Sequence, residues 1–432
     1  MSVKVTFIGA GSVTFSKKLM MDILSTPELE DTSFSLFDID PERLETAKLI
    51  CEDLEGHNKA KVYATLNRKE ALRGADFVVN MIQVGMHEAT LIDFKIPAKY
   101  GLKQTIADTT GVGGVFRGLR TLPVMLSLAQ DMAEVCPDAY LLNYTNPMPI
   151  NCLGFFLGTK KLGLNIKAVG LCHSVQGTSE MLADYLKVPY EELEYFVAGI
   201  NHMAWFLKLK HNGEDLYPAL FRAMEDEEIY KKNKVRFEIM RHFGYFVTES
   251  SEHMSEYTAY FIKDPKLIKQ LDIPINEYIT RSENNLKTYA ENRAKILKGE
   301  KLELEHSREY ASGIIGAITT GKVWSFNGNF LNDGLIDNLP RESAVEVPCL
   351  VDRSGIHPCH VGNLPAQLAA LNTTNINVHR LAVEAFLTGK KEYLYHAVAL
   401  DPLASSILNL DQVRAMVDEL IAAHGDALPK LS

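Results

Sequence analysis

Residues 5–15, VTFIGAGSVTF, place a glycine-rich turn between an apolar run and an amphipathic segment. The β-branched and aromatic residues predict a buried strand, and the segment that follows predicts a helix over 13–24. Gly9 permits the tight turn, Gly11 lets the backbone approach a pyrophosphate at the helix N-terminus, and Ser12 lies beside it. Thr14 replaces the third glycine of the usual GxGxxG fingerprint. This stretch predicts a dinucleotide-binding turn at the start of a doubly wound sheet.

The second predicted strand, 33–37, ends in Asp38. A carboxylate at this place binds the ribose hydroxyls of a dinucleotide and disfavours a 2′-phosphate, so we expect NAD rather than NADP. Asp38 lies 29 residues after Gly9 (38 − 9), more than the usual separation of about 20, which predicts a longer crossover. The alternative is a solvated aspartate that precedes a helix beginning at Pro41.

Apolar strand patterns at 76–82, 140–143 and 167–171 alternate with helical patterns, such as 151–162. This alternation predicts an α/β fold with a parallel, doubly wound sheet. From about residue 191 the pattern changes to a hairpin (194–200 and 204–210), a charged helix (225–240), helices at 275–298, a strand at 344–350, a loop at 352–365 and a helical tail. We therefore expect a Rossmann-like NAD-binding domain over 1–190 and an α+β domain over 191–432 for substrate, metal and oligomerisation.

Ligands of such sheets lie beyond the carboxyl ends of the strands. Besides Gly9, Gly11 and Asp38, several polar residues fall at that edge of the predicted sheet: Asn80, Gln83, Asn143, Asn146, Cys172 and His173. Their convergence on one edge predicts a site that holds both the dinucleotide and a second ligand.

Composition excludes several classes of partner. The chain has 432 residues and a net charge of −10, which argues against nucleic acid or an anionic membrane surface as the main partner. No apolar run approaches a spanning helix, and the N-terminus enters a strand at once. The six cysteines lack framework spacing, so we expect reduced thiols and a cytoplasmic protein.

Cys172 and His202 each follow an apolar run, in GLCHSVQGT and GINHMAWF. A thiolate and an imidazole are ligands that a borderline-soft divalent metal accepts, and two protein ligands leave positions open for a substrate. The alternative is a core cysteine that behaves as a small hydrophobic residue.

Two further segments carry candidate residues. The loop 104–114 is rich in glycine and polar groups, precedes a helix predicted from Phe116, and contains Asp108, which could tune a neighbour. In VTESSEHMSEY (247–257), His253 and Tyr257 are four residues apart and would align on a helix. A mobile surface loop is the alternative for 104–114.

With these residues in view, the chain resembles glycoside hydrolase family 4, the NAD- and metal-dependent glycosidases, over essentially its whole length. The segments that carry the resemblance are FIGAGS, LLNYTNPM, GLCHSVQGT, GINHMAWF, VTESSEHMSEY and NDGLIDNLP. Cys-His-Ser-Val at 172–175 is associated with the α-galactosidase branch. This family is an exception to two-carboxylate glycoside hydrolysis.

The resemblance implies a C-terminal domain like that of lactate and malate dehydrogenases, and hydrolysis of terminal α-galactosides of the melibiose type. NAD oxidises C3 of the sugar, a base removes the C2 proton, the aglycone is eliminated, water adds, and the hydride returns. Mn²⁺, or another divalent metal, binds the C2 and C3 oxygens as a Lewis acid.

The resemblance also implies roles for individual residues. Cys172 and His202 match the metal ligands, and His173 matches the acid that protonates the departing oxygen. Asn146 and Asn201 match substrate-binding positions, and Asp108 matches a residue that raises the basicity of the base. Tyr257 and His253 are both candidates for that base: Tyr requires a depressed pKa, which a metal could supply, whereas His does not.

Three alternatives remain at this stage. A hydroxy-acid dehydrogenase shares the fold and NAD but gives Cys172 and His202 no role, and a nucleotide-binding regulatory protein would perform no chemistry. A family member could also act on another α-glycoside, such as a galacturonide. The family further implies a homo-oligomer, either a dimer or a tetramer.

Overall fold

The computed structural model describes residues 2–57, 59–300, 302, 306–307 and 309–432. Its strands form one 12-stranded sheet in the order β3-β2-β1-β4-β5-β6-β10-β11-β7-β8-β9, with β12 paired to β11. The strands are β1 (Lys4–Ile8), β2 (Ser33–Phe37), β3 (Lys61–Thr65), β4 (Phe77–Asn80), β5 (Tyr140–Asn143), β6 (Lys167–Gly170), β7 (Leu193–Ile200), β8 (Met203–His211), β9 (Glu214–Asp215), β10 (Trp324–Leu331), β11 (Ala344–Asp352) and β12 (Gly355–Pro358).

The first six strands form the predicted parallel half. β1 pairs in parallel with both β2 and β4, and β4, β5 and β6 follow in parallel register. This 3-2-1-4-5-6 order places the switch point between β1 and β4, where dinucleotides bind. The central strands β1, β4 and β5 are short and mostly buried, which explains why their sequences read as continuous apolar runs, whereas the edge strand β3 has no buried residue.

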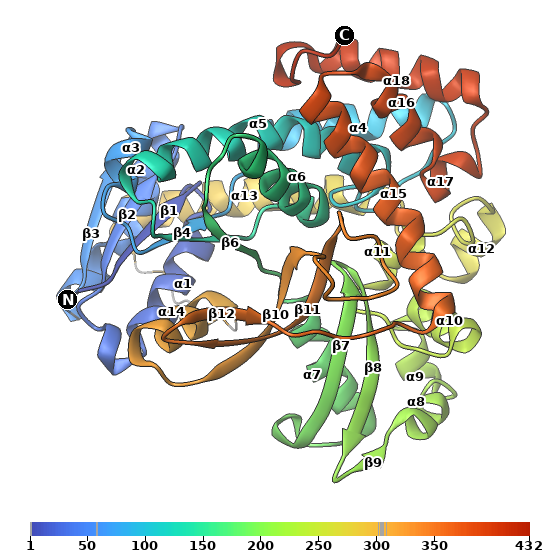
Figure 1. Cartoon of the computed structure of the whole chain (residues 1–432), viewed down its shortest axis with the longest axis horizontal. Helices are drawn as coiled ribbons and strands as arrows, with labels where there is room; N and C mark the ends of the chain where they lie inside the picture. Colours follow the sequence, from blue (N-terminus) through green and yellow to red (C-terminus); the bar gives the residue numbers. More distant parts are fainter. Residues whose placement is uncertain (1, 58, 301, 303–305, 308) are drawn as a thin grey trace.

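Helices connect these strands, and Figure 1 shows them on both sides of the parallel strands. They are α1 (Val13–Leu24), α2 (Pro41–His57), α3 (Arg68–Leu72), α4 (Met86–Lys99), α5 (Gly111–Val135) and α6 (Met148–Lys161), whereas α7 (Ser174–Leu186) follows β6 and packs against β7 in the second half. The prediction that the helix after the loop begins at Phe116 is wrong, because α5 already begins at Gly111. Gly113 lies in its first turn, where a Cβ would approach the Ala107 carbonyl oxygen to 2.5 Å, so this glycine serves helix packing.

The second half is antiparallel. β10 pairs with β6 through the single register pair Asn329 and Gly170, and β11 joins β10 to the β7–β8 hairpin. Its helices are α8 (Tyr217–Ala223), α9 (Glu227–Tyr230), α10 (Lys234–Phe243), α11 (Ser251–Glu256), α12 (Pro265–Gln270), α13 (Glu277–Leu297), α14 (Tyr310–Thr320), α15 (Ala366–Thr388), α16 (Lys391–Ala399), α17 (Pro402–Ser405) and α18 (Leu410–His424).

Two predictions for this half are wrong. The single helix expected over 225–240 is two helices, α9 and α10, with a turn between them. The loop expected over 352–365 contains β12, which extends β11 as a hairpin. The elements β3, α14 and β10 had no counterpart in the sequence analysis.

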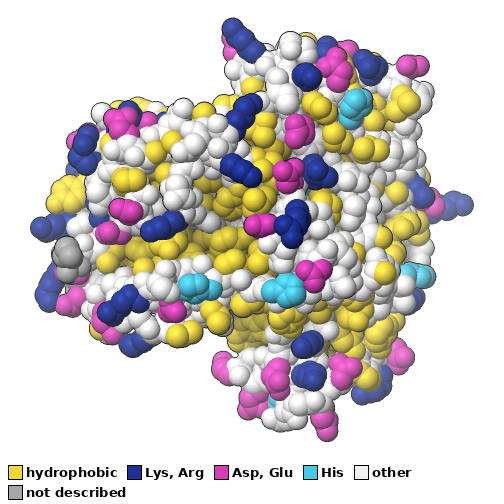
Figure 2. All heavy atoms as spheres, viewed as in Figure 1, with side chains coloured by type: hydrophobic (Ala, Val, Ile, Leu, Met, Phe, Trp, Pro, Cys, Tyr) yellow, Lys and Arg dark blue, Asp and Glu magenta, His cyan; other side chains and the backbone are white. Residues whose placement is uncertain are grey.

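No helix within the described part of the chain is both long and apolar enough to cross a membrane. Hydrophobic side chains gather around α6 on the face shown in Figure 2. In this helix Phe156 and Leu157 are only partly buried, and Leu162 at its end is 46% exposed.

A buried ion cluster fixes α5, which carries the preceding loop into place. Asp93 of α4 accepts hydrogen bonds from both terminal nitrogens of Arg120 on α5, at 3.0 and 2.7 Å. His424 at the end of α18 contacts the same carboxylate at 2.8 Å, and all three side chains are buried. The C-terminal helix is thereby tied to the helix that begins three residues after Asp108.

Substitution of Asp93 by Ala should lower the free energy of unfolding by about 3–5 kcal/mol, because Arg120 then stays buried without its partner. The exposed pair Lys99–Glu419 joins α4 to α18, as the Asp93–His424 contact does, so Glu419→Ala is the control and should cost less than about 1 kcal/mol. Urea denaturation followed by circular dichroism measures both. Equal losses of the free energy of unfolding in the two variants would contradict the conclusion that the buried Asp93 cluster fixes α5.

Candidate active site

The glycine turn after β1 is held against the end of β2. The backbone N–H groups of Gly9 and Ala10 both donate to the Phe37 carbonyl oxygen at 3.0 Å. Gly9 has φ = +85°, which an L side chain rarely adopts, and a Cβ on Gly11 would lie 2.6 Å from Asp38 Oδ2. Ser12 is the exposed N-cap of α1, and its hydroxyl makes no cap hydrogen bond. This bare helix N-terminus fits a pyrophosphate.

The Asp38 side chain packs against the backbone of this turn. One carboxylate oxygen accepts from the Gly11 N–H at 2.7 Å, and the other accepts from the Asp40 N–H at 3.0 Å. The carboxylate is therefore oriented by backbone donors from both sides. Ile39 beside it is 87% exposed, although it is a large apolar residue. An acid and an apolar side chain at this edge suit a ribose and the flat base attached to it.

The other predicted cofactor residues lie at the ends of β4 and β5. Asn80 donates its amide to the side-chain oxygen of Asn143 at 2.8 Å, and both side chains are buried. The oxygen of Asn80 has no partner among the described residues. Gln83 follows β4 and is only partly buried. The structure thus brings Asn80 and Asn143 together and leaves Gln83 beside them in the loop after β4.

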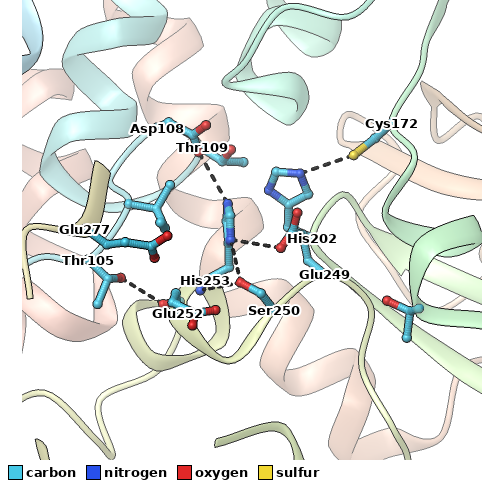
Figure 3. Close-up of polar contacts among 12 residues, drawn as sticks. Thr105, Asp108, Thr109, Cys172, His202, Glu249, Ser250, Glu252, His253 and Glu277 are labelled. Carbon is cyan, nitrogen blue, oxygen red and sulfur yellow. Dashed lines mark hydrogen bonds and ion pairs between the residues drawn. The ribbon is translucent and has the colours of Figure 1, made fainter. Parts of the chain in front are cut away.

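Cys172 and His202 meet at the seam between the two halves of the sheet. Their Sγ and Nε2 atoms are 3.3 Å apart (Figure 3). Two ligands of one ion at about 2.3 and 2.1 Å lie about 3.1–3.6 Å apart when their angle at the ion is 90–109°. The pair therefore has the separation that a shared metal ion requires. Cys172 comes directly from the β6 end, as the sequence predicted.

His202 reaches this position through an unusual turn. Asn201 and His202 are the two loop residues of the β7–β8 hairpin, in which Ile200 pairs with Met203. His202 has φ = +63°, a region that favours glycine. Ala107 and Glu249, which border the same site, also have positive φ, at +48° and +72°. Strain at three positions around one cluster is typical of functional sites.

A second imidazole, His253, lies against His202, with ring centroids 4.6 Å apart. Its Nδ1 contacts Glu249 and Ser250 at 3.0 Å each, and its Nε2 faces Asp108 at 3.6 Å. Burial works to lower the pKa of His253, but the carboxylates of Glu249 and Asp108 outweigh it and raise that pKa well above its usual value. His253 is therefore a buried cation between two carboxylates.

His202 has the opposite protonation state. Burial and the positive charge of His253 lower the pKa of His202 to about 4, so its imidazole is neutral. A neutral imidazole is the form that binds a metal. Burial raises the pKa of the Cys172 thiol to about 11, so a cation is needed to make it a thiolate at neutral pH.

Among the described residues, one group of three has all its ligand atoms within 4.8 Å of one another: Asp108, His202 and His253. His202 belongs both to this group and to the pair with Cys172. The Cys172–His202 pair has the separation of two ligands of one ion, and Asp108 and His253 are further candidate ligands around the shared His202. Three carboxylates lie near His202: Glu249, Asp108 and Glu346.

Asp108 is also joined to Asn146. The Asn146 amide donates to Asp108 Oδ2 at 3.1 Å, and the Thr109 hydroxyl donates to Oδ1 at 2.7 Å. Burial disfavours the charged form, but the facing His253 cation outweighs it and holds the pKa of Asp108 below its usual range. Asn201 is fully buried, and neither of its side-chain polar atoms makes a geometric hydrogen bond within the described residues, although its side chain lies beside Glu346.

His173 is the N-cap of α7, and its side chain is 67% exposed. Its Nδ1 contacts Glu309 at 3.2 Å. The hydrogen bond to Glu309 raises the pKa of His173, although solvent screens an exposed ring. A protonated imidazole at the rim of a site can donate a proton to a ligand that enters from solvent.

Tyr257 follows α11 and is 1% exposed, and its hydroxyl has no geometric hydrogen-bond partner within the described residues. Burial and the nearby carboxylates of Asp108, Glu256 and Glu249 raise its pKa well above the usual value. Neither Tyr257 nor His253 is therefore in its basic form here, and the choice between them stays a prediction.

Sequence reasoning missed several partners in this site. Glu249 and Ser250 lie in the same segment as His253, and the i, i+4 spacing of Glu249 and His253 could have indicated the ion pair. Glu309 had no such signal, because it approaches His173 only through the fold. The same holds for Arg117, which donates to the Asn146 carbonyl oxygen at 3.2 Å.

The fold defined by these elements is that of NAD-type dehydrogenases with an enlarged second half. A crystal structure of malate dehydrogenase from Plasmodium falciparum aligns with a TM-score of 0.51 at 16% identity, covering 89% of this chain and 99% of that one. A structure of 6-phospho-α-glucosidase from gut microorganisms, solved in complex with NAD and Mn²⁺, aligns with a TM-score of 0.84 at 21% identity over 100% of both chains.

Sequence comparison gives the family. Residues 4–188 match the family 4 glycosyl hydrolases, and residues 197–404 match the C-terminal domain of that family. An α-galactosidase of Bacillus subtilis strain 168 is 48% identical over 433 residues, which is 99% of each chain. The chain belongs to glycoside hydrolase family 4, and the predicted family and fold class are confirmed.

Substitution of Gly11 by Ala should weaken binding of NAD⁺ by about 10-fold or more, because the added Cβ would press on the Asp38 carboxylate and on Arg43. Gly316→Ala is a suitable control, since nothing lies within 4 Å of a Cβ at that position in α14. Isothermal titration with NAD⁺ measures both affinities. If the Gly11 variant binds NAD⁺ with wild-type affinity, this turn is not part of the cofactor site.

Proposed function

We propose that the protein is an α-galactosidase that uses NAD and a divalent metal, most simply Mn²⁺, to hydrolyse terminal α-galactosides. The observation that carries this proposal is the 48% identity to a Bacillus subtilis α-galactosidase along the whole of both chains. The site supports it, because the Cys172–His202 pair lies with the glycine turn at the carboxyl edge of the parallel strands, as an enzyme with both cofactors requires.

NAD would supply reversible hydride transfer at C3 of the sugar, at the edge formed by Gly9, Gly11, Ser12, Asp38, Asn80, Gln83 and Asn143. A divalent metal held by Cys172 and His202 would supply Lewis acidity toward the C2 and C3 oxygens. The remaining work belongs to the side chains around these two places. They orient the ring, move one proton at C2 and donate another to the departing oxygen.

The proton at C2 becomes acidic once C3 is a carbonyl, and a base must stand beside it. Tyr257 and His253 both border Asp108, and either can serve once its proton has moved. Asp108 favours the removal of a proton from the substrate, because its negative charge stabilises the protonated base. Asn146 and Asn201 would orient the sugar hydroxyls, and Asn146 is already held by Asp108 at 3.1 Å.

His173 would be the acid for the leaving group. Its exposed side chain supports this role, because a donor to the aglycone must be open to solvent, and its contact with Glu309 favours the protonated form. After the aglycone has left, water would add to the unsaturated sugar, and bound NAD would supply the hydride that restores C3 to its original oxidation level. The reaction is redox-neutral overall, which distinguishes it from that of a hydroxy-acid dehydrogenase.

The proposal extends to the roles of the two domains, the oligomeric state and the cellular location. We assign residues 1–190 to cofactor binding, and 191–432 to substrate, metal and subunit contact. The apolar surface around α6, with Phe156, Leu157 and the 46% exposed Leu162, supports a homo-oligomer. The composition and scattered thiols support a cytoplasmic location.

A panel of aryl glycosides tests the activity. With NAD⁺ and Mn²⁺ present, the α-galactoside should be cleaved, and the β-galactoside, α-galacturonide and 6-phosphorylated analogues should react much more slowly. A chelator should reduce the rate to background and added Mn²⁺ should restore it. Deuterium at C2 or C3 should slow the reaction if those bonds break in the rate-influencing steps. Net NADH accumulation without glycoside cleavage would favour a dehydrogenase instead.

Substitution of Cys172 by Ser tests the metal ligand directly. It should lower the affinity for Mn²⁺ by more than the ~10–100-fold that loss of an outer-shell partner causes, because a hydroxyl does not replace a thiolate. Cys359→Ser is the control, since that partly buried cysteine lies after β12. Electron paramagnetic resonance of free Mn²⁺ gives both affinities, and thiol oxidants should inactivate only proteins that retain Cys172. If the Mn²⁺ affinity is unchanged, Cys172 is not a ligand, and Asp108, His202 and His253 become the candidate metal site.

A further inference from the structure

Glu256, the last residue of α11, is buried and accepts three successive backbone N–H groups of the loop before Asp108. Its Oε2 accepts from Thr105 at 3.0 Å and from Ile106 at 3.3 Å, and its Oε1 accepts from Ala107 at 2.8 Å. None of these three N–H groups lies in a helix or strand, so the carboxylate satisfies donors that would otherwise be buried without partners.

This contact fixes an unfavourable backbone. Ala107 has φ = +48°, and its N–H makes the shortest of the three hydrogen bonds. The next residue is Asp108, whose carboxylate must reach both His253 and the Asn146 amide. The conformation at Ala107 decides where that carboxylate points, and charge-assisted hydrogen bonds are strong enough to hold a strained residue.

The short helix α11 therefore grips one loop at two places. His253 faces the side chain of Asp108 at 3.6 Å, and Glu256, three residues later, holds the backbone just before it. The Thr105 hydroxyl adds a third tie, to the Glu252 carbonyl oxygen at 2.8 Å. This last bond uses the helix backbone and does not depend on the Glu252 side chain.

We propose that Glu256 is a positioning residue for the reaction: by binding the N–H groups of residues 105–107, its carboxylate sets Asp108 against His253 and Asn146. The inference rests on the proposed function in one respect, that Asp108 acts in the reaction. Glu256 acts only through Asp108. A purely structural role would instead change stability and activity independently of Asp108.

Substitution of Glu256 by Gln keeps the shape but turns an amide N–H₂ toward backbone donors. We expect kcat to fall by about 10–100-fold, as a misplacement of about 1 Å does, with KM and NAD⁺ affinity within about threefold of wild type. Glu252→Gln is the matched control on the same helix and should retain wild-type kcat. Hydrogen exchange of the peptide 104–110 should be faster in the Glu256 variant only.

A double-mutant cycle with Asp108→Asn separates positioning from structure. If Glu256 acts through Asp108, the double variant should be no slower than Asp108→Asn alone, within about twofold. Two results would overturn the proposal. One is a fold-loss of kcat in the double variant equal to the product of the losses in the two single variants. The other is unchanged hydrogen exchange of the peptide 104–110 in the Glu256 variant. If even the wild-type protein cleaves no galactoside, the proposed function fails, and the exchange comparison still decides whether Glu256 holds the loop.

Discussion

One buried positive charge, on the imidazole of His253, organises the centre of the molecule. It lies between the carboxylates of Glu249 and Asp108, with contacts of 3.0 and 3.6 Å. Removal of either carboxylate from this arrangement would leave only one to balance the buried charge, and the charge would lose part of its stabilisation. Burial and this charge lower the pKa of the neighbouring His202, whose imidazole is therefore neutral, the form that binds a metal. Protonation of His253 thus helps to keep His202 in the neutral form that can bind a metal.

The sequence predicted the parallel half of the fold closely because local signals and the global topology agree there. The glycine turn, Asp38 and the strand ends at Asn80 and Asn143 follow from periodicity and turn chemistry within short segments. The second half was predicted less well. β10 had no counterpart, because its segment contains asparagine and glycine, and its identity as a strand depends on pairing with β11.

The site divides in the same way. Cys172 and His202 were predicted because each follows an apolar run, and their pairing required only that two strand ends meet. Contacts of Glu309 with His173, and of Glu256 with the loop before Asp108, depend on folds of long segments that no local pattern encodes. Charges that tune a site are supplied across the fold, so their sequence spacing carries little information.

The two halves of the sheet are joined at β6 and β10 by the single register pair Asn329 and Gly170. Cys172 lies two residues beyond Gly170, whereas His202 belongs to the hairpin of the antiparallel half. An ion bound by both the Cys172 sulfur and the His202 nitrogen would therefore also cross-link the two halves of the sheet. Its binding free energy adds to the stability of that joint, so a change in metal affinity also changes how stably the two halves are held together.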